Sequence, residues 1–450
     1  MEASPPWLVS FVFHLVLLLV LALLTIPNPA IQSVMLVLDP SLATDEGLDD
    51  DEFQVEAADL DVETPEVSFD ELPVEDPLAA MPEIELDLSG LTAAANINAT
   101  SIGAALTGRE EGNKKALLAQ YGGTKTTEEA VKLALGWLAR QQRADGSWSL
   151  TGPYSSGALT ENRVAATAMA LLAFQGAGIT PSKGKYKAEV AKGSKALLKM
   201  QGRDGFFQER NGSRHQQLYA HAQAMIAICE LYGMTKNSKY KEPAQKAIQF
   251  AVKAQAIEGG WRYQLGVDSD LSVTGWFLMG LQSARMAGLE VPRDTLYRIS
   301  EFLDKVQTRN GSRYRYRVGE GGPTPSMTAE GLLCRQYLGW DQDDSRLVRG
   351  VRSLVERPIN YRQMDVYYWY YATQVCHHQE GEAWEKWNAV MRKLVPAAQI
   401  KVGREKGSWD PRTDAWGNLG GRLYTTCLST YMLEVYYRHL PIYSYRKKKQ

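Results

Sequence analysis

The sequence predicts an all-α protein whose globular part is a closed ring of about six helix pairs, or about twelve helices. Three observations predict it: an uncharged apolar stretch near the N-terminus, a following acidic segment without basic residues, and a degenerate repeat of roughly fifty residues over the rest of the chain. A membrane anchor and an acidic linker are therefore expected to precede the ring.

The N-terminal segment has the length and composition of a transmembrane helix. Residues 7–26 (WLVSFVFHLVLLLVLALLTI) carry no charge, and such a helix spans about 30 Å, the hydrocarbon thickness of a bilayer. The missing n-region charge and a poor cleavage site favour an uncleaved anchor over a signal peptide. Residues 1–29 are thus predicted to form a single-pass membrane anchor. Neither flank offers the Lys or Arg that would indicate which side of the membrane carries the ring.

Residues 30–108 are predicted to be a disordered linker. Residues 1–108 contain 20 Asp and Glu and no Lys or Arg, so beyond them the basic residues exceed the acidic ones by 18. Acidic side chains interrupt each short apolar run, which prevents a core from forming. Lys and Arg form a run only at residues 446–449, so we do not expect a nucleic acid partner. A further interpretation is that the acidic linker folds back on the basic ring as an autoinhibitory arm.

The repeat begins with an amphipathic helix and a turn, as in LARQQRADGSW at residues 138–148. Each copy places a Gln a few residues before a Gly, with an aromatic residue shortly after it. Gly supplies positive φ for the turn, the Gln can hydrogen-bond backbone groups near it, and the aromatic ring can cover the seam to the next repeat. The recurring Gln residues are Gln142, Gln201, Gln255, Gln307 and Gln399.

The second half of each repeat is apolar almost all round, as expected for a helix buried on several sides. One such hairpin cannot bury its faces alone, so the repeats must stack. An open solenoid of the HEAT or TPR type is the alternative, but the period is longer than in either, and six units are expected to close around a central cavity. These second helices are expected at residues 165–174, 219–231, 273–284, 328–337, 366–375 and 424–436.

The string LARQQRADGSW closely resembles the QW repeat of squalene cyclases, oxidosqualene cyclases and the β-subunits of protein prenyltransferases. The likeness covers roughly residues 126–445 and is best preserved at residues 134–150 and 247–281. The resemblance implies that residues 109–450 form an (α/α)6 toroid with a largely apolar central cavity.

The acid motif of squalene-hopene-type cyclases is degenerate in this chain. At the place where the resemblance puts D-x-D-D-T, residues 268–272 read DSDLS. Asp270 matches the central acid, but a partner carboxylate that would strengthen it is missing. The resemblance makes Asp270 and Asp268 the candidate catalytic residues. The alternative is that one of these polar residues caps the helix that starts near Val273.

The prenyltransferase alternative requires a zinc ion held by an Asp-x-Cys pair, and the chain contains no such pair. His377 and His378 follow a cysteine, but adjacent helical residues point about 100° apart and do not easily share one metal. We therefore predict no metal and no cofactor. The cysteines lie in apolar helical stretches and are expected to be small buried side chains. They are Cys229, Cys334, Cys376 and Cys427.

Several residues near the expected cavity are candidate ligand contacts. A tryptophan or tyrosine there could stabilise a carbocation by cation–π contact. Five successive aromatic residues, 367–371, cover every side of a helix, so some of them must pack in the core. Trp369 or Tyr370 could equally line the cavity. A carbohydrate site, as in the polysaccharide-degrading enzymes that share the sixfold ring, could also use these aromatics. A histidine at the mouth of an inner helix is more often a partly buried polar residue than a ligand contact. The candidates are His221, Trp261, Tyr263, Trp276, Trp369 and Tyr424.

Two functions fit these features. The first is a membrane-anchored binding protein that takes an isoprenoid-like lipid, an apolar peptide or a protein partner in or at its central cavity. The second is an active class II terpene cyclase with Asp270 as the protonating acid. Authentic cyclases carry two toroidal domains, whereas this chain has residues for one, and its acid motif is degenerate. The binding function is therefore favoured, and the sequence leaves catalytic activity open.

Overall fold

The computed structural model describes residues 106–209 and 212–443. The predicted membrane anchor at residues 7–26 and nearly all of the predicted linker lie outside these residues. Within the described ranges, no helix is both long and apolar enough to cross a bilayer.

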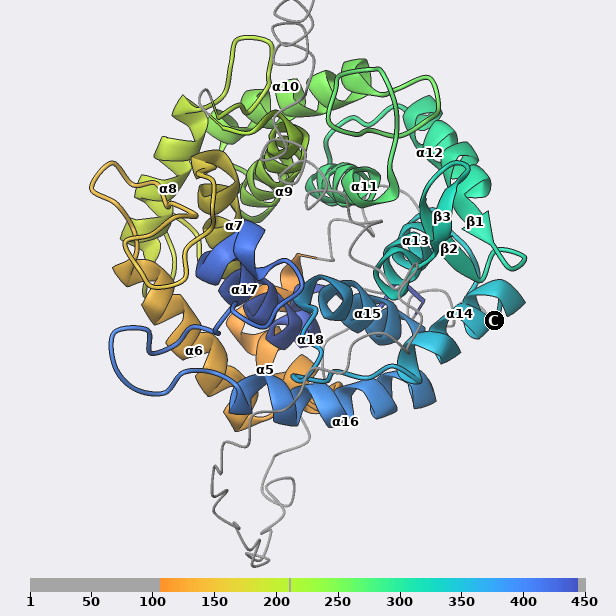
Figure 1. Ribbon diagram of the computed structural model, residues 1–450. Helices are drawn as coiled ribbons and strands as arrows, with labels where there is room; N and C mark the ends of the chain where they lie inside the picture. Colours follow the sequence, from red (N-terminus) through yellow and green to blue (C-terminus); the bar gives the residue numbers. More distant parts are fainter. Residues whose placement is uncertain (1–105, 210–211, 444–450) are drawn as a thin grey trace, which may run out of the picture. The chain divides into compact units, whose positions relative to one another are not determined.

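Helices of the described chain form two concentric rings (Figure 1). Neighbouring inner helices contact one another, and α17 contacts α7, so the inner ring closes. The predicted ring of helix pairs is therefore confirmed, together with all six apolar second helices. The inner helices are α7 (Arg163–Gly176), α9 (Gln217–Thr235), α11 (Leu271–Ala287), α13 (Pro325–Tyr337), α15 (Val366–Gln379) and α17 (Gly417–Leu433). The outer helices are α6 (Lys125–Arg140), α8 (Lys187–Lys199), α10 (Ser238–Ala254), α12 (Arg293–Val306), α14 (Ser345–Val355) and α16 (Gly381–Ala397).

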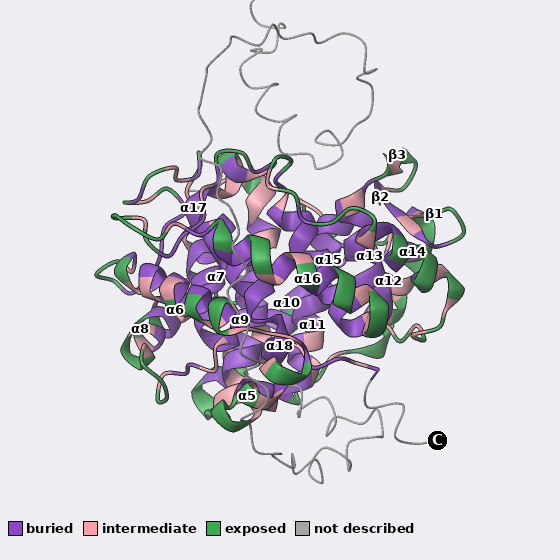
Figure 2. Cartoon of the chain, turned by 90° about the horizontal axis from the view of Figure 1, so that it is seen from below, coloured by how far each residue is buried: buried purple, intermediate pink, exposed green. Residues whose placement is uncertain are grey.

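Burial follows the two helix patterns of the repeat. Every residue of α7 after Arg163 is buried, because this inner helix packs against outer helices as well as against the neighbouring inner helices. The outer helix α12 buries only one stripe, which includes Thr295, Ile299 and Phe302 at helical spacing. Figure 2 shows the same contrast between the buried interior and the exposed outer surface.

Four of the five recurring Gln residues, all except Gln307, tie neighbouring repeats together. The side-chain amide of Gln142 donates to the carbonyl of Gly146 in its own turn at 2.9 Å and to that of Glu189 on α8 at 2.8 Å. The expected bond at the turn is confirmed, and the second bond crosses to the next outer helix. Three further residues repeat this double contact: Gln201 with Gly205 and Pro243, Gln255 with Gly259 and Thr295, and Gln399 with Gly407 and Ala130.

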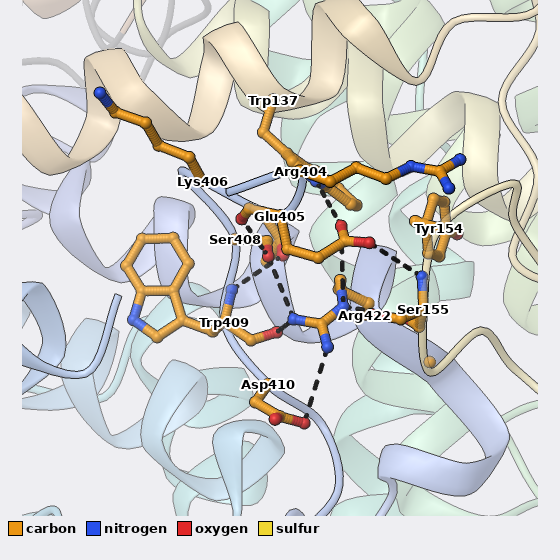
Figure 3. Close-up of polar contacts among 12 residues, drawn as sticks. Trp137, Tyr154, Ser155, Arg404, Glu405, Lys406, Ser408, Trp409, Asp410 and Arg422 are labelled. Atoms are coloured by element: carbon orange, nitrogen blue, oxygen red, sulfur yellow. Dashed lines mark hydrogen bonds and ion pairs between the residues drawn. The ribbon is translucent and has the colours of Figure 1, made fainter. Parts of the chain in front are cut away.

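The ring closes where the loop after α16 meets the loop after α6 (Figure 3). Buried Arg422 donates from Nε to the carbonyl of Ser155 at 2.8 Å and from Nη1 to Ser408 Oγ at 3.1 Å. Glu405 accepts from the indole of Trp137 at 3.0 Å and from the amide of Ser155 at 2.9 Å. The first and last repeats are thus joined by a charged network rather than by apolar packing alone.

Short elements cover the ends of the ring. The outer-to-inner loops and the start of each inner helix form one end, here called the N-terminal face. The small antiparallel sheet β1 (Gln307–Thr308), β2 (Arg313–Arg317) and β3 (Glu320–Pro323) lies in one of these loops and was not predicted. At the opposite end, the C-terminal face, lie η2 (Thr107–Arg109), α5 (Glu111–Gln120) and α18 (Val435–Arg438) (Figure 2). The remaining element, η3 (Arg214–Gln216), immediately precedes α9.

The packed part of the chain starts a few residues before 109. Leu106 and Gly108, which belong to the predicted linker, are buried against the C-terminal face. A Cβ on Gly108 would lie 2.7 Å from the carbonyl of Tyr437 in α18. This close approach explains why glycine stands there.

Candidate functional site

Asp270 is the N-cap residue of α11 on the N-terminal face and is fully buried. Its Oδ1 accepts hydrogen bonds from the backbone N–H of Val273 at 2.7 Å and from the hydroxyl of Ser272 at 2.9 Å. Its Oδ2 accepts from the hydroxyl of Tyr316 at 2.8 Å and lies 3.4 Å from Nε of Arg262. Asp270 therefore caps α11, as one interpretation of the sequence predicted, and each of its oxygens faces two donors.

The protonation of Asp270 is set by two opposing effects. Burial disfavours the carboxylate and raises the pKa of Asp270 to about 7. The donors around it favour the ionised form and limit that rise. Near neutral pH the group therefore exists in both protonation states.

Asp268 lies nearer the surface than Asp270. Its Oδ2 is 2.8 Å from Nη1 of Arg262 and 3.4 Å from Nη2 of Arg317. Arg317 in turn pairs with Glu320 across the β2–β3 turn at 2.8 Å. Asp268 is thus part of a partly exposed ion-pair network that holds the hairpin against the loop before α11.

A second buried carboxyl, Glu330 on α13, lies beside Asp270 and was not predicted. The hydroxyl of Tyr367 donates to its Oε2 at 3.0 Å, and the same hydroxyl lies 3.4 Å from the carbonyl of Ser272. Burial raises the pKa of Glu330 well above its usual range and so favours the neutral acid. A Cβ on Gly275 would lie 2.1 Å from Oε1 of Glu330, so α11 needs glycine there. The sequence signal that could have indicated this residue is a glutamate within an otherwise apolar second helix.

Tyrosine hydroxyls extend this group toward the surface. Tyr219 and Ser272 share a hydrogen bond of 2.5 Å, and the hydroxyls of Tyr263 and Tyr316 are 2.7 Å apart. The guanidinium of Arg262 lies over the ring of Tyr263 at 4.5 Å. Hydrogen bonds therefore run from half-buried Tyr263 inward to the buried carboxyls. We call Tyr219, Asp270, Ser272, Tyr316, Glu330 and Tyr367 the Asp270–Glu330 cluster.

Aromatic side chains meet across the centre of the ring below this cluster. Trp276 on α11 stacks on Tyr370 of α15 with ring centroids 5.8 Å apart, although these helices are not neighbours in the ring. Tyr370 also contacts Tyr431 of α17 at 5.7 Å. Trp276, a predicted ligand contact, is only 1% exposed and belongs to this packed layer.

The other predicted aromatic contacts separate into two groups. Trp261 is buried, stacks on Phe277 at 4.5 Å and donates its indole N–H to the carbonyl of Ala251, which are contacts of a repeat seam. Trp369 is 2% exposed and packs on Tyr361 at 4.9 Å. The two that stay half-buried are Tyr263 and Tyr424.

His221 occupies a position that other repeats fill with threonine. Its Nδ1 accepts from the backbone N–H of Phe207 at 3.2 Å. Burial lowers the pKa of His221 to about 3, so the ring is neutral and can accept that bond. In other repeats a threonine hydroxyl accepts from the N–H of the aromatic residue: Thr167 from Trp148, Thr274 from Trp261, Thr328 from Tyr314 and Thr426 from Trp409.

This equivalence gives a prediction for paired variants. His221→Thr keeps an acceptor for the N–H of Phe207, whereas His221→Val has a similar shape without one. We expect the free energy of unfolding of the Val variant to be about 1–3 kcal/mol lower than that of the Thr variant, because the buried N–H of Phe207 loses its hydrogen-bond partner. Urea denaturation of both full-length variants measures the difference. Equal stabilities would contradict a backbone-satisfying role for position 221.

Metal and cofactor sites were sought among the described residues. There, no group of three His, Cys, Asp or Glu side chains has the geometry of a metal site. The four cysteines are buried and unpaired with one another. Nε2 of His377 lies 2.8 Å from the carbonyl of His439, so His377 and His378 belong to the packing of the C-terminal face.

No sequence model of a known family matches the chain, and no curated protein sequence does either. Solved structures do. A cellobiose 2-epimerase from Bacillus thermoamylovorans aligns with a TM-score of 0.51 and 12% identity, over 72% of this chain and 100% of that one. The α-1,6-mannanase GH76A of a Salegentibacter species aligns with a TM-score of 0.50 and 9% identity, over 69% and 98%.

A type II terpene cyclase from Scytonema aligns with a TM-score of 0.48 and 12% identity, over 70% of this chain and 98% of the cyclase. At these identities a likeness shows the fold alone, and the cyclase alignment is too weak to support an argument. The comparisons therefore support an α/α toroid and do not extend to the squalene cyclase family that the QW-like repeat resembles.

Proposed function

We propose that the chain is a membrane-anchored toroid that binds an apolar, isoprenoid-like ligand at its N-terminal face and does not catalyse cyclisation. The hydrogen-bond partners of the Asp270 carboxyl are the main observation that supports this proposal. A class II cyclase acid must direct its proton at an alkene. Both oxygens of Asp270 instead face the cap of α11, Ser272, Tyr316 and Arg262. Proton delivery would require breaking contacts that hold the loop and helix together.

The composition of the N-terminal face supports an apolar ligand. Leu265 and Val267, in the loop before α11, are 52% and 59% exposed, and Val318 at the β2–β3 turn is 44% exposed. Exposed apolar side chains that gather on one face are typical of binding sites. Half-buried Tyr263 and Tyr424 add amphipathic rings whose hydroxyls can hydrogen-bond a ligand headgroup. An anchor at residues 7–26 would keep the protein at a membrane that supplies such lipids.

The test uses full-length protein in detergent with geranylgeraniol as the probe and native mass spectrometry as the readout. We expect binding by the wild type and by Asp270→Asn, since Asn also caps helices. Leu265→Asp with Val267→Asp should weaken binding by about tenfold or more, because the ligand loses apolar contact. The matched control, Tyr297→Asp with Val348→Asp on the outer surface, should bind as the wild type does.

The cyclase alternative is tested on the same preparations. Incubation with squalene and shorter polyprenyl substrates, followed by mass spectrometry, is expected to yield no cyclised product. A cyclised product that disappears in Asp270→Asn would overturn the proposal in favour of catalysis. Equal geranylgeraniol binding by the loop and control variants would overturn the proposed ligand face.

A further inference from the structure

The outer surface over α8 and α10 carries a concentration of exposed lysines. The segment from residue 183 to the end of α8 has six of them and a single acidic residue, Glu189. In α12, by contrast, three basic residues are balanced by three acidic ones. We call this surface the α8–α10 basic face. Its exposed lysines are Lys183, Lys185, Lys187, Lys192, Lys195, Lys199, Lys236, Lys239, Lys241 and Lys253.

The lysines of the two helices belong to one continuous surface. The turn after α8 packs directly on α10, where the amide of Gln201 donates to the carbonyl of Pro243 at 2.9 Å. A Cβ on Gly205 in that turn would lie 2.3 Å from the carbonyl of Lys246. Figure 1 shows α8 and α10 side by side on the outside of the ring.

These lysines are largely uncompensated within the described chain. None of the α8 lysines forms an ion pair with another described residue, and on α10 the pair between Lys246 and Glu242, at 2.7 Å, is the i,i+4 contact of a single helix turn. Ten like charges on one surface repel one another and attract an anionic partner. The face is therefore suited to an extended, acidic chain.

We propose that residues 39–87 of the same chain dock on the α8–α10 basic face. This segment has 19 Asp and Glu and no Lys or Arg, the opposite composition to the face. Covalent connection gives the segment an effective concentration in the millimolar range, so weak contacts suffice to dock it. Contacts between exposed charges are screened by salt, and docking should be lost at high ionic strength. Docking shortens the reach of the linker, and release lengthens it.

Lysine acetylation followed by mass spectrometry tests this in the full-length protein in detergent. A variant in which all 19 acidic residues of 39–87 become Asn or Gln provides the undocked reference. In 0.1 M salt, lysines of the face should react at least about twofold more slowly in the wild type than in the variant. In 1 M salt, where the Debye length falls from about 10 Å to about 3 Å, the rates should converge. Lys386 and Lys393 on α16 serve as controls and should not change.

A second variant tests the face itself. Lys192→Glu with Lys195→Glu and Lys199→Glu should remove the salt-dependent protection of Lys241 and Lys253 on α10. Equal reaction rates in the wild type and the neutralised variant at 0.1 M salt would overturn the proposal. Protection that arises only after addition of vesicles containing phosphatidylserine would identify an anionic membrane as the partner, and would also overturn it.

Discussion

Replacing Glu230 by Gln is expected to lower the free energy of unfolding by about 3–5 kcal/mol, because it leaves buried positive charge without its partner. Oε2 of Glu230 lies 2.6 Å from Nη1 of Arg109 and 3.6 Å from Nη2 of Arg438. The side chains of all three residues are at most 2% exposed. Arg438 also pairs with Glu434, at 3.0 Å, and keeps this partner in the variant. Among the described residues Arg109 pairs only with Glu230, so the variant leaves Arg109 without a carboxylate partner.

Urea unfolding followed by tryptophan fluorescence measures this loss. Glu242→Gln is the matched control: its pair with Lys246 is exposed, and we expect a change within about 1 kcal/mol. Burial alone would raise the pKa of Glu230, but Arg109 and Arg438 hold it below the usual value of 4.5. Stability from this group is therefore present above pH 4.5 and is lost as the pH falls through the lower pKa of the folded state. If Glu230→Gln lowered the free energy of unfolding by less than Glu242→Gln does, the ion pairs of Glu230 with Arg109 and Arg438 would not be what holds η2 to the ring.

The sequence predicted the ring well because each repeat encodes its own boundaries. A Gly at positive φ ends the turn at Gly146, Gly205 and Gly407, and the apolar second stretch can only be an inner helix. These are local signals, and they recur around the ring. The elements on the C-terminal face escaped prediction because they depend on pairs such as Arg109 with Glu230, which are 121 residues apart.

The candidate site was predictable only in part, for a related reason. Asp270 was found because it lies in a motif, and the structure gives it the capping contact that spacing suggested. Glu330 was missed because its role depends on Tyr367 from α15 and Gly275 from α11, which come together only when the ring closes. The exposure of single side chains was also not predictable. Trp276 and Tyr263 are both aromatic residues close to Asp270 in the sequence, but Trp276 packs across the centre of the ring and Tyr263 is half-buried.

His378→Phe is expected to make the protein markedly more resistant to acid. His378 on α15 is 1% exposed, and neither ring nitrogen has a hydrogen-bond partner among the described residues. Burial, together with a smaller contribution from neighbouring His377, lowers the pKa of His378 to about 3. The folded state therefore keeps the ring neutral, while in the unfolded chain it titrates near 6.5.

The sign of the pH effect follows from this difference. As the pH falls below 6.5, the unfolded chain binds a proton that the folded chain refuses, so stability falls by about 1.4 kcal/mol per unit until the folded pKa is reached. Between pH 6.5 and 4.5 this one residue should lower the free energy of unfolding by about 2 kcal/mol, and His378→Phe removes that loss. Buried carboxyls with raised pKa values, such as Glu330, oppose this trend, but they titrate alike in both proteins and cancel in the difference.

The neighbouring histidine supplies the matched control. His377 bonds the carbonyl of His439 at 2.8 Å, and burial lowers its pKa to about 4. At pH 7, His377→Phe should be destabilised by about 1 kcal/mol through the lost bond, whereas His378→Phe should be neutral or more stable than the wild type. At pH 4.5 both variants should gain relative to the wild type, because each lacks one group that refuses a proton. Unfolding curves of His378→Phe that run parallel to those of the wild type from pH 7 to 4.5 would mean that the folded protein protonates His378 as readily as the unfolded chain does.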